Sequence, residues 1–479
     1  MKFSLHTSRR LLGCTILCAL LSCFNVSAQF HHRAYLGWIR DLASEAKPTD
    51  EWPCITIDSN LLHDYDQTFK VMRETGLNEI VIWGFFVSRE WPVALENTMD
   101  DTRKEQVMAI INKAHAYNIK VLSGLGVYNW GFDAIIRANP HLSCKDNPHS
   151  MCLYQPESWE WQKRVIDYIF SLPLDGVNLQ SADQGRCSCD ESRNMSDMAY
   201  HAVINQKVIQ YIRKEYPGKI ISIGGWGMNI KNKEDLLSLH SMTNNADYFT
   251  DVRDNNLSPY SDSFRVNMIN KIKPCLYGTT GTPNVEPPQH WVRDRWFLPT
   301  AKRAAKELQR LYRQGGRSVE NYMHVIANPG DEATIRLMAA IEQNPGDNWA
   351  PAYKLILSKM FSPVDKEAMN ELFELFINAE DNYFNNIENY KATDIVRLEP
   401  LVSDKAGKPV YILEKMKKEN RRKYLAGTER LLQKAESLKT KVGNKPLMEK
   451  VITCLNNTRQ EILHNISTIP ISTPPAVLK

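Results

Sequence analysis

The side chains with the clearest potential for chemistry lie in residues 174–190. Val177 and Leu179 alternate as they would in a buried strand, and the apolar pattern then stops. Gln180 and Asp183 come directly after it, and a carboxylate at the carboxyl end of a strand is placed for general acid or base catalysis. An Asp that only caps a turn has the same local sequence. The surrounding elements therefore have to decide between the two interpretations.

Two periodicities alternate through the first three quarters of the chain, and they predict parallel strands joined by crossover helices. Eight strand–helix units in roughly 310 residues predict an α/β fold, a (β/α)8 TIM barrel. A doubly wound sheet is the alternative, but the Gly-rich phosphate turn that would come after its first strand is not in the sequence. The predicted strands are 35–39, 79–86, 120–127, 174–179, 219–223, 247–250, 274–277 and 318–325. The main predicted helices are 61–75, 103–117, 197–216, 261–272 and 299–314.

From Asn348 onward the sequence predicts helices only, at 352–360, 366–386 and 411–441. We therefore expect a TIM-barrel domain of catalytic type at 29–346 and a helical C-terminal domain with a disordered tail at 347–479. The formal net charge of +4 is small for 479 residues, and it supplies no basic field of the kind that nucleic-acid binding needs.

The first 28 residues have the features of a secretory signal peptide. Lys2, Arg9 and Arg10 precede an apolar run at 11–21, and a small-residue cleavage pattern ends at Ala28. That run is too short for a transmembrane helix, and no later segment is predicted to span a bilayer. We expect export to the periplasm or the cell surface. A lipobox-like sequence ends at Cys23, so a lipid anchor there is the alternative to soluble export, and the sequence indicates no oligomeric state.

Seven cysteines come after the predicted signal peptide, and an exported chain favours disulfides. The odd number leaves at least one thiol free or paired elsewhere. Cys187 and Cys189 alone are too few for a closed zinc site, which normally needs four ligands. We therefore predict a structural role in the loop, with no metal and no cofactor. We also expect Cys144 to pair with Cys152 and brace a loop at the site.

Aromatic and acidic side chains recur where the predicted strands end, the face on which barrel enzymes carry their chemistry. Sugar rings stack on flat apolar side chains, and cleavage of a glycosidic bond needs one protonated and one ionised carboxyl group. The aromatic candidates are Trp83, Trp130, Trp226 and Trp291, and the carboxylate candidates are Asp183, Asp251 and Glu286. Further candidates for substrate binding are Gln180, Arg186, Arg253, Asp254 and Asn328. The two arginines would suit a uronic acid, because guanidinium pairs with carboxylate in a fork.

The runs 130–133, 139–141, 156–159 and 175–189 resemble bacterial secreted glycoside-hydrolase-like barrels near the α-glucuronidases and β-N-acetylhexosaminidases. The resemblance covers about residues 33–345 and a helical C-terminal part. It implies hydrolysis of a polysaccharide or glycan, with Asp183 as the general acid and Asp251 or Glu286 as the base. The sequence departs from these families in having Asp for the usual fourth-strand Glu, and in lacking the Asp-Glu pair of the hexosaminidases. A catalytically silent glycan-binding protein on the same barrel therefore stays open as the alternative.

Overall fold

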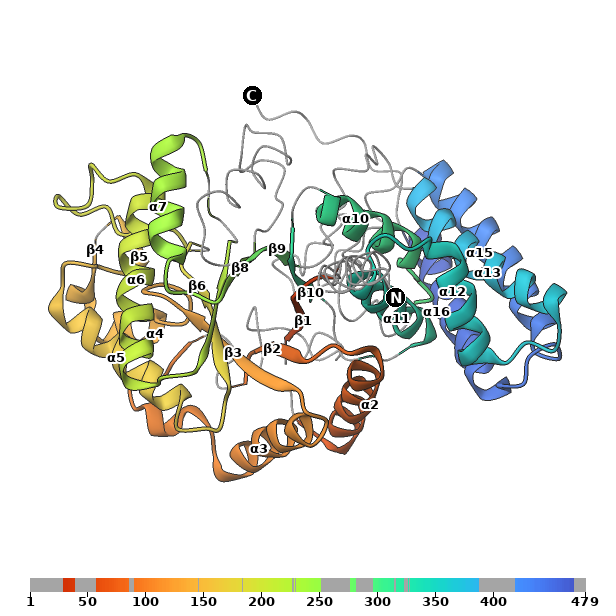
Figure 1. Cartoon of the computed structure of the whole chain (residues 1–479), viewed down its shortest axis with the longest axis horizontal. Coiled ribbons are helices and arrows are strands. Elements are labelled where there is room, and N and C mark those ends of the chain that lie inside the picture. The colour runs from red at the N-terminus through yellow and green to blue at the C-terminus, as the bar shows by residue number, and fades with distance from the viewer. Residues whose placement is uncertain are drawn as a thin grey trace, which may run out of the picture.

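The computed structural model describes residues 29–38, 57–85, 90–144, 146–182, 184–225, 228, 230–250, 276–280, 296–313, 316–322, 326, 328–386 and 418–468. In this part of the chain, parallel strands form a barrel with helices around it, and further helices pack on one side (Figure 1).

The barrel consists of eight parallel strands and is closed, because β1 pairs with both β2 and β10. This confirms the predicted (β/α)8 architecture. In barrel order the strands are β1 (His32–Trp38), β2 (Glu79–Trp83), β3 (Lys120–Gly126), β6 (Gly176–Gln180), β7 (Ile220–Gly224), β8 (Tyr248–Thr250), β9 (Leu276–Thr280) and β10 (Ser318–Tyr322). Each predicted strand overlaps one of these.

Helices and short elements connect the strands. They are α2 (Ser59–Thr75), η1 (Leu95–Thr98), α3 (Asp101–Ala116), α4 (Asp133–Ala138), η2 (Pro140–Leu142), α5 (Pro156–Ile169), α6 (Asp197–Glu215), α7 (Lys233–Thr243), α10 (Ala301–Arg313) and α11 (Pro329–Gln343). A hairpin of β4 (Ser143–Cys144) and β5 (Asn147–Met151) comes after β3 and was not predicted. The predicted helix at 261–272 lies outside the described residues.

Local sequence signals account for the ends of the longer helices. The Asp58 side chain accepts the N–H of Leu61 at the start of α2, and Gly76 ends the helix with a left-handed φ of 73°. The Asp100 side chain caps α3 in the same way. These helices pack apolar faces on the barrel, whose core strands are Val- and Ile-rich and buried.

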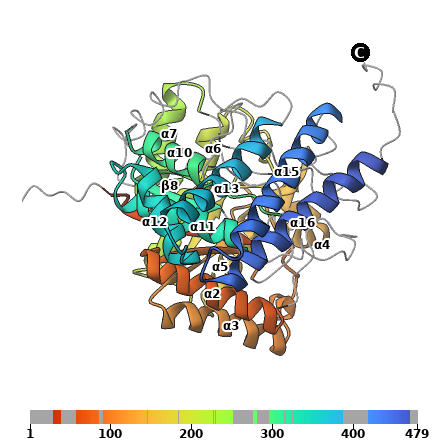
Figure 2. The ribbon, with the colours of Figure 1, turned by 90° about the vertical axis from the view of Figure 1, so that its right-hand side faces the viewer.

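The C-terminal helices are α12 (Trp349–Phe361), α13 (Lys366–Asn385), α15 (Lys418–Leu438) and α16 (Lys445–Thr468) (Figure 2). Helix α15 packs on α13 and α16, and helices α12, α13 and α16 contact α10 or α11. Glu380 of α13 is buried at this contact, and its carboxylate accepts the backbone N–H groups of Lys302 and Arg303. Those two groups lie in the first turn of α10, where a negative charge stabilises the helix. The C-terminal helices thus cap α10, one of the helices around the barrel. Helix α16 was not predicted, and the boundary at 346/347 stays a prediction.

Among the described helices, none combines the length and the hydropathy that a membrane span requires.

Glu342 of α11 is a buried carboxyl group whose environment opposes ionisation. Its Oε1 accepts a hydrogen bond of 2.7 Å from Asn321, and its Oε2 has no partner among the described residues. Burial raises the pKa of Glu342 from 4.5 to about 7, although the Asn321 hydrogen bond and the charge of Arg33 act in the opposite direction. The folded chain therefore keeps this proton over a pH range in which the unfolded chain has lost it.

This difference predicts a pH-dependent stability. Between pH 4.5 and 7 the folded state binds more protons than the unfolded state, so the free energy of unfolding falls as pH rises. Glu342→Gln removes this contribution, and the variant should lose less stability over that range, by an amount on the order of 3 kcal/mol. Denaturant titrations at pH 4.5 and 8 measure it. Glu105→Gln, on the exposed face of α3, is the control. Identical pH dependence in wild type and Glu342→Gln would contradict the assignment.

Candidate active site

Two tryptophans meet where β2 and β3 end. Their rings are edge to face with centroids 6.2 Å apart, Trp83 being buried and Trp130 half-buried. The Trp83 ring lies directly over Gly124 of β3. A Cβ atom added to Gly124 would be only 1.9 Å from the ring. Glycine at that position leaves the space that the ring occupies inside the barrel. The structure therefore brings together two of the four predicted aromatic side chains.

The end of β6 adds amide groups beside these rings. The Nε2 of Gln180 lies close to Gly224 of β7. A Cβ atom added to Gly224 would be 2.7 Å from this nitrogen. The Oε1 of Gln180 and the Oδ1 of Asn178 are both buried without a hydrogen-bond partner among the described residues. Buried acceptors are rarely left unpaired, so two of them on one strand indicate a place for a water molecule or a ligand hydroxyl.

A polar network lies inside the barrel beneath this position. The Nδ2 of Asn178 donates to Ser222 Oγ at 2.6 Å and to Glu320 Oε1 at 3.1 Å. Glu320 is fully buried. Since a carboxylate only accepts hydrogen bonds, Glu320 fixes the orientation of the Asn178 amide and leaves its oxygen facing elsewhere. Complete burial suits Glu320 to orienting a neighbour, not to proton exchange with a substrate.

The network continues to the opposite wall through Tyr248. Its hydroxyl interacts with Ser222 and donates to Glu79 Oε2 at 3.3 Å, and its ring stacks on His32 at 3.4 Å. The His32 Nδ1 is 3.0 Å from the same carboxylate. Burial alone would raise the pKa of Glu79, but the hydrogen bond and the charge interaction with His32 outweigh it, so this pKa lies below its usual value. Glu79 is therefore held ionised within the barrel.

These interior residues were not predicted from the sequence. The predicted site residues lie beyond the strand ends or at them, whereas His32, Glu79, Asn178 and Glu320 lie within the strands. The available signal was the strand alternation itself, because Asn178 and Gln180, or Ser318 and Glu320, are two residues apart and so share a face.

The chain around Asp183 is held from both sides, although Asp183 itself lies outside the described residues. The Asn129 side chain donates to the carbonyl oxygens of Ser181 and Gly185. Asn147 of β5 donates to the carbonyl oxygens of Gln184 and Arg186, at 3.0 and 3.3 Å. The segment on either side of the predicted acid is thus anchored to the connection after β3.

The turn after β3 supplies that anchor through an unusual backbone conformation. Tyr128 has a φ of 62°, which is costly for a residue with a large side chain. Gln162 accepts its N–H at 2.9 Å, and its carbonyl accepts the N–H of Met151 at 2.6 Å. These contacts direct the next two residues, Asn129 and Trp130, toward the strand ends. Backbone strain of this kind concentrates at functional sites.

Two predicted substrate ligands serve the protein's own structure. Arg186 donates to Asp197 at 2.8 Å and to the carbonyl oxygens of Ser192 and Met195, at 3.0 and 2.8 Å. Asn328 caps α11, since its Oδ1 accepts the N–H groups of Gly330 and Asp331. These contacts favour structural roles for both side chains, and a role in substrate binding stays a prediction.

Seven of the predicted residues lie outside the described part of the chain, so their placement stays a prediction. They are Asp183, Asp251, Glu286, Trp226, Arg253, Asp254 and Trp291.

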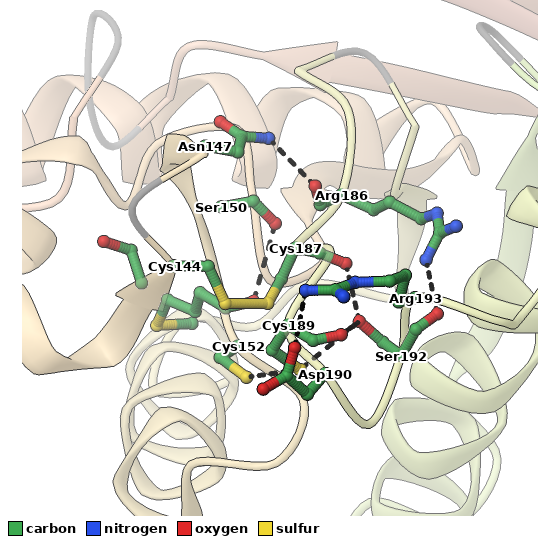
Figure 3. The surroundings of a disulfide bond; sticks show 12 residues. Cys144, Asn147, Ser150, Cys152, Arg186, Cys187, Cys189, Asp190, Ser192 and Arg193 are labelled. Carbon is green, nitrogen blue, oxygen red and sulfur yellow. Dashed lines mark hydrogen bonds and ion pairs between the residues drawn. A yellow bond between two sulfur atoms is a disulfide. The ribbon is translucent and has the colours of Figure 1, made fainter.

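The predicted pairing of Cys144 with Cys152 is wrong. Cys144 forms a disulfide with Cys187, and Cys152 Sγ lies 3.6 Å from Cys189 Sγ (Figure 3). The hairpin register explains this, because it pairs Ser143 with Met151 and Cys144 with Asn147, so the two cysteines are not opposite each other. Both instead face the loop after β6.

The described residues thus define a closed (β/α)8 barrel with an aromatic pair where β2 and β3 end. Two amide oxygens of β6, from Asn178 within the strand and Gln180 at its end, have no partner among these residues. No protein-family model matches the sequence, and no curated protein matches it.

Solved structures share the fold. A mutant of the Thermobaculum terrenum O-GlcNAc hydrolase is 12% identical, with a TM-score of 0.50 over 91% of this chain and 81% of that chain. A GH138 enzyme targeting pectin rhamnogalacturonan II is 10% identical, with a TM-score of 0.57 over 91% of this chain and 71% of that chain. The chain therefore has a glycoside-hydrolase-like fold. The relation to α-glucuronidases or hexosaminidases in particular is not shown.

The contacts of Asn129 generate a prediction about the strand-end segment. Asn129→Ala leaves two carbonyl oxygens without their donor and should lower the free energy of unfolding by about 1–3 kcal/mol. Amide hydrogen exchange in residues 181–186 should also become faster, because this loop loses its anchor. Asn112→Ala, at an exposed position of α3, is the matched control. Unchanged exchange in this segment would show that Asn129 does not hold it.

Proposed function

We propose that this protein is a glycoside hydrolase that acts on a polysaccharide or glycan by carboxylate acid/base chemistry at the carboxyl ends of the barrel strands. The observation that carries the proposal is the pair of Trp83 and Trp130 together with the oxygens of Asn178 and Gln180, which have no partner among the described residues. The Trp83 ring covers Gly124, the register partner of Asn178. A sugar offers apolar C–H faces to aromatic rings and hydroxyl donors to amide oxygens. The fold shared with two glycoside hydrolases supports the same class.

The catalytic roles are the finer part of the proposal. Asp183 acts as the general acid, and Asp251 or Glu286 acts as the base. Support for Asp183 comes from its neighbours in sequence, since Asn129 holds the carbonyl groups of Ser181 and Gly185 after β6. A general acid needs such fixed placement, because proton transfer requires hydrogen-bond distance to the leaving oxygen.

A uronic acid is the anionic sugar that we propose as part of the substrate. With Arg186 bound to Asp197, the guanidinium that would recognise its carboxylate is that of Arg253. We further propose that the chain is exported, either soluble or anchored by a lipid at Cys23, on the strength of its first 28 residues.

A screen of glycan hydrolysis with wild type and three Asp→Asn variants tests the proposal. Asp183→Asn and Asp251→Asn should each lower kcat by about 10²–10⁴-fold, because each removes a proton-transferring group. Asp190→Asn should retain wild-type turnover. Asp190 follows Asp183 in the same connection, is exposed, and pairs with Arg193. It therefore controls for the charge change alone.

Different results would reject different parts of the proposal. Full turnover in both Asp183→Asn and Asp251→Asn would exclude Asp183 as the acid and Asp251 as the base but leave the hydrolase. A wild-type chain that binds glycans without cleaving any would exclude the hydrolase and indicate a glycan-binding protein on the same barrel.

The aromatic pair makes a separate prediction about binding. Trp130→Ala should raise the dissociation constant for the glycan found in the screen about tenfold, or about 1.4 kcal/mol, because a stacking surface is lost. Isothermal titration calorimetry measures this directly. Trp159→Ala is the control, since Trp159 lies between α5 and α6 near Lys163 and Lys207. Equal affinity in both variants would rule out Trp130 as a sugar platform.

A further inference from the structure

Four cysteines from two loops meet at one point (Figure 3). Cys144 is the last residue of β4 and Cys152 directly follows β5, whereas Cys187 and Cys189 lie in the loop after β6. Their four sulfur atoms all lie within 4.8 Å of one another. The two pairs are more than 30 residues apart in sequence, so only folding brings them together.

We propose that these four cysteines form a tetrahedral zinc site. Zinc binds thiolate sulfur at about 2.3 Å, which places each pair of sulfurs in a tetrahedral site about 3.8 Å apart. The Cys152 and Cys189 sulfurs are 3.6 Å apart. Two disulfides would require only that sulfurs approach in pairs. A metal ion requires all four sulfurs to surround one point. The four do lie within 4.8 Å of one another, with Cys144 and Cys187 joined as a disulfide in the structure.

Polar groups around the sulfurs supply a second, independent observation. The backbone N–H groups of Tyr154 and Gln155 hydrogen-bond to the Cys152 sulfur. Donors of this kind offset the negative charge on thiolates that bind a metal, and they orient the ligands. A disulfide sulfur carries no charge and needs no such donors.

The composition and burial of the cluster indicate a structural site. Four protein ligands fill a tetrahedral zinc ion and leave no position for a substrate or a water molecule. Cys152 and Cys187 are buried, and Cys144 and Cys189 are half-buried. A zinc ion here would join the connection after β3 to the loop after β6. It would fix that loop four residues beyond Asp183.

The disulfide of Cys144 and Cys187 and a zinc ion are alternative states of the same cluster. A disulfide uses two of the sulfurs and leaves Cys152 and Cys189 as thiols, whereas zinc binds all four as thiolates. The proposal assigns the zinc state to the protein as isolated from cells. It concerns a metal that holds loops together, and it does not depend on the proposed hydrolase activity.

Metal analysis of the full chain tests the proposal. The protein, purified in non-reducing buffer without chelators, should contain one zinc ion per chain by mass spectrometry of the metal. Cys189→Ser should contain only background zinc. Cys454→Ser should keep the wild-type content, because Cys454 is a buried cysteine of α16 outside the cluster. Zinc-free wild type with the Cys144–Cys187 disulfide, whether Cys152 and Cys189 are thiols or a second disulfide, would overturn the proposal. Iron in place of zinc would overturn the metal assignment.

A second measurement uses the wild-type chain alone, so that misfolding of a variant does not affect it. Zinc is removed with a chelator under reducing conditions and replaced by Co²⁺. The cobalt protein should show the intense visible absorption of tetrahedral cobalt bound by thiolates. Weak absorption typical of octahedral cobalt with oxygen ligands would contradict a site made of four cysteine thiolates.

Discussion

The hydrogen bonds that Asn178 donates to Ser222 and Glu320 connect three strands inside the barrel, and the surroundings of the candidate site depend on them. Glu320 is fully buried, and a buried carboxylate is costly without hydrogen-bond donors. Because it accepts only, the Asn178 amide nitrogen must face it, and the amide oxygen must face elsewhere. Gln180 lies two residues further along β6, so its side chain is on the same face of the strand.

The site is held by polar contacts between loops as well as by the apolar core. Asn129 and Asn147, from the connection after β3, each donate to two carbonyl oxygens of the loop after β6. The four cysteines join the same two segments. Loops usually lack a core of their own, so side chains that bind backbone, or a metal ion, are needed to hold them in one geometry. The proposed zinc site and the amide contacts therefore both hold the connection after β3 against the loop after β6.

A shared fold does not decide between catalysis and binding. An aromatic pair and unpaired amide oxygens serve a hydrolase and a sugar-binding protein equally well, because both must hold the same ring. The two differ in whether two carboxyl groups with separated pKa values flank the scissile bond. The buried Glu79 and Glu320 do not supply such a pair, since both are committed to the interior network. The distinction therefore depends on the acidic residues beyond the strand ends.

The sequence alone determined the order of strands and helices and the barrel that they form, because alternation and helical period are encoded in neighbouring residues. Trp83 and Gln180, two of its candidate residues, are the last residues of β2 and β6 in the structure. Only the tertiary structure decided which distant side chains meet. Asn178 and Glu320 are 142 residues apart, and Cys144 and Cys187 are 43 apart. Such contacts depend on the register between strands and on the path of each loop across the barrel, and neither is written in the local sequence. For the same reason Cys187 and Cys189, which by themselves are too few for a metal site, belong to a cluster of four cysteines in the structure. Arg186, which was expected to bind substrate, is hydrogen-bonded to Asp197.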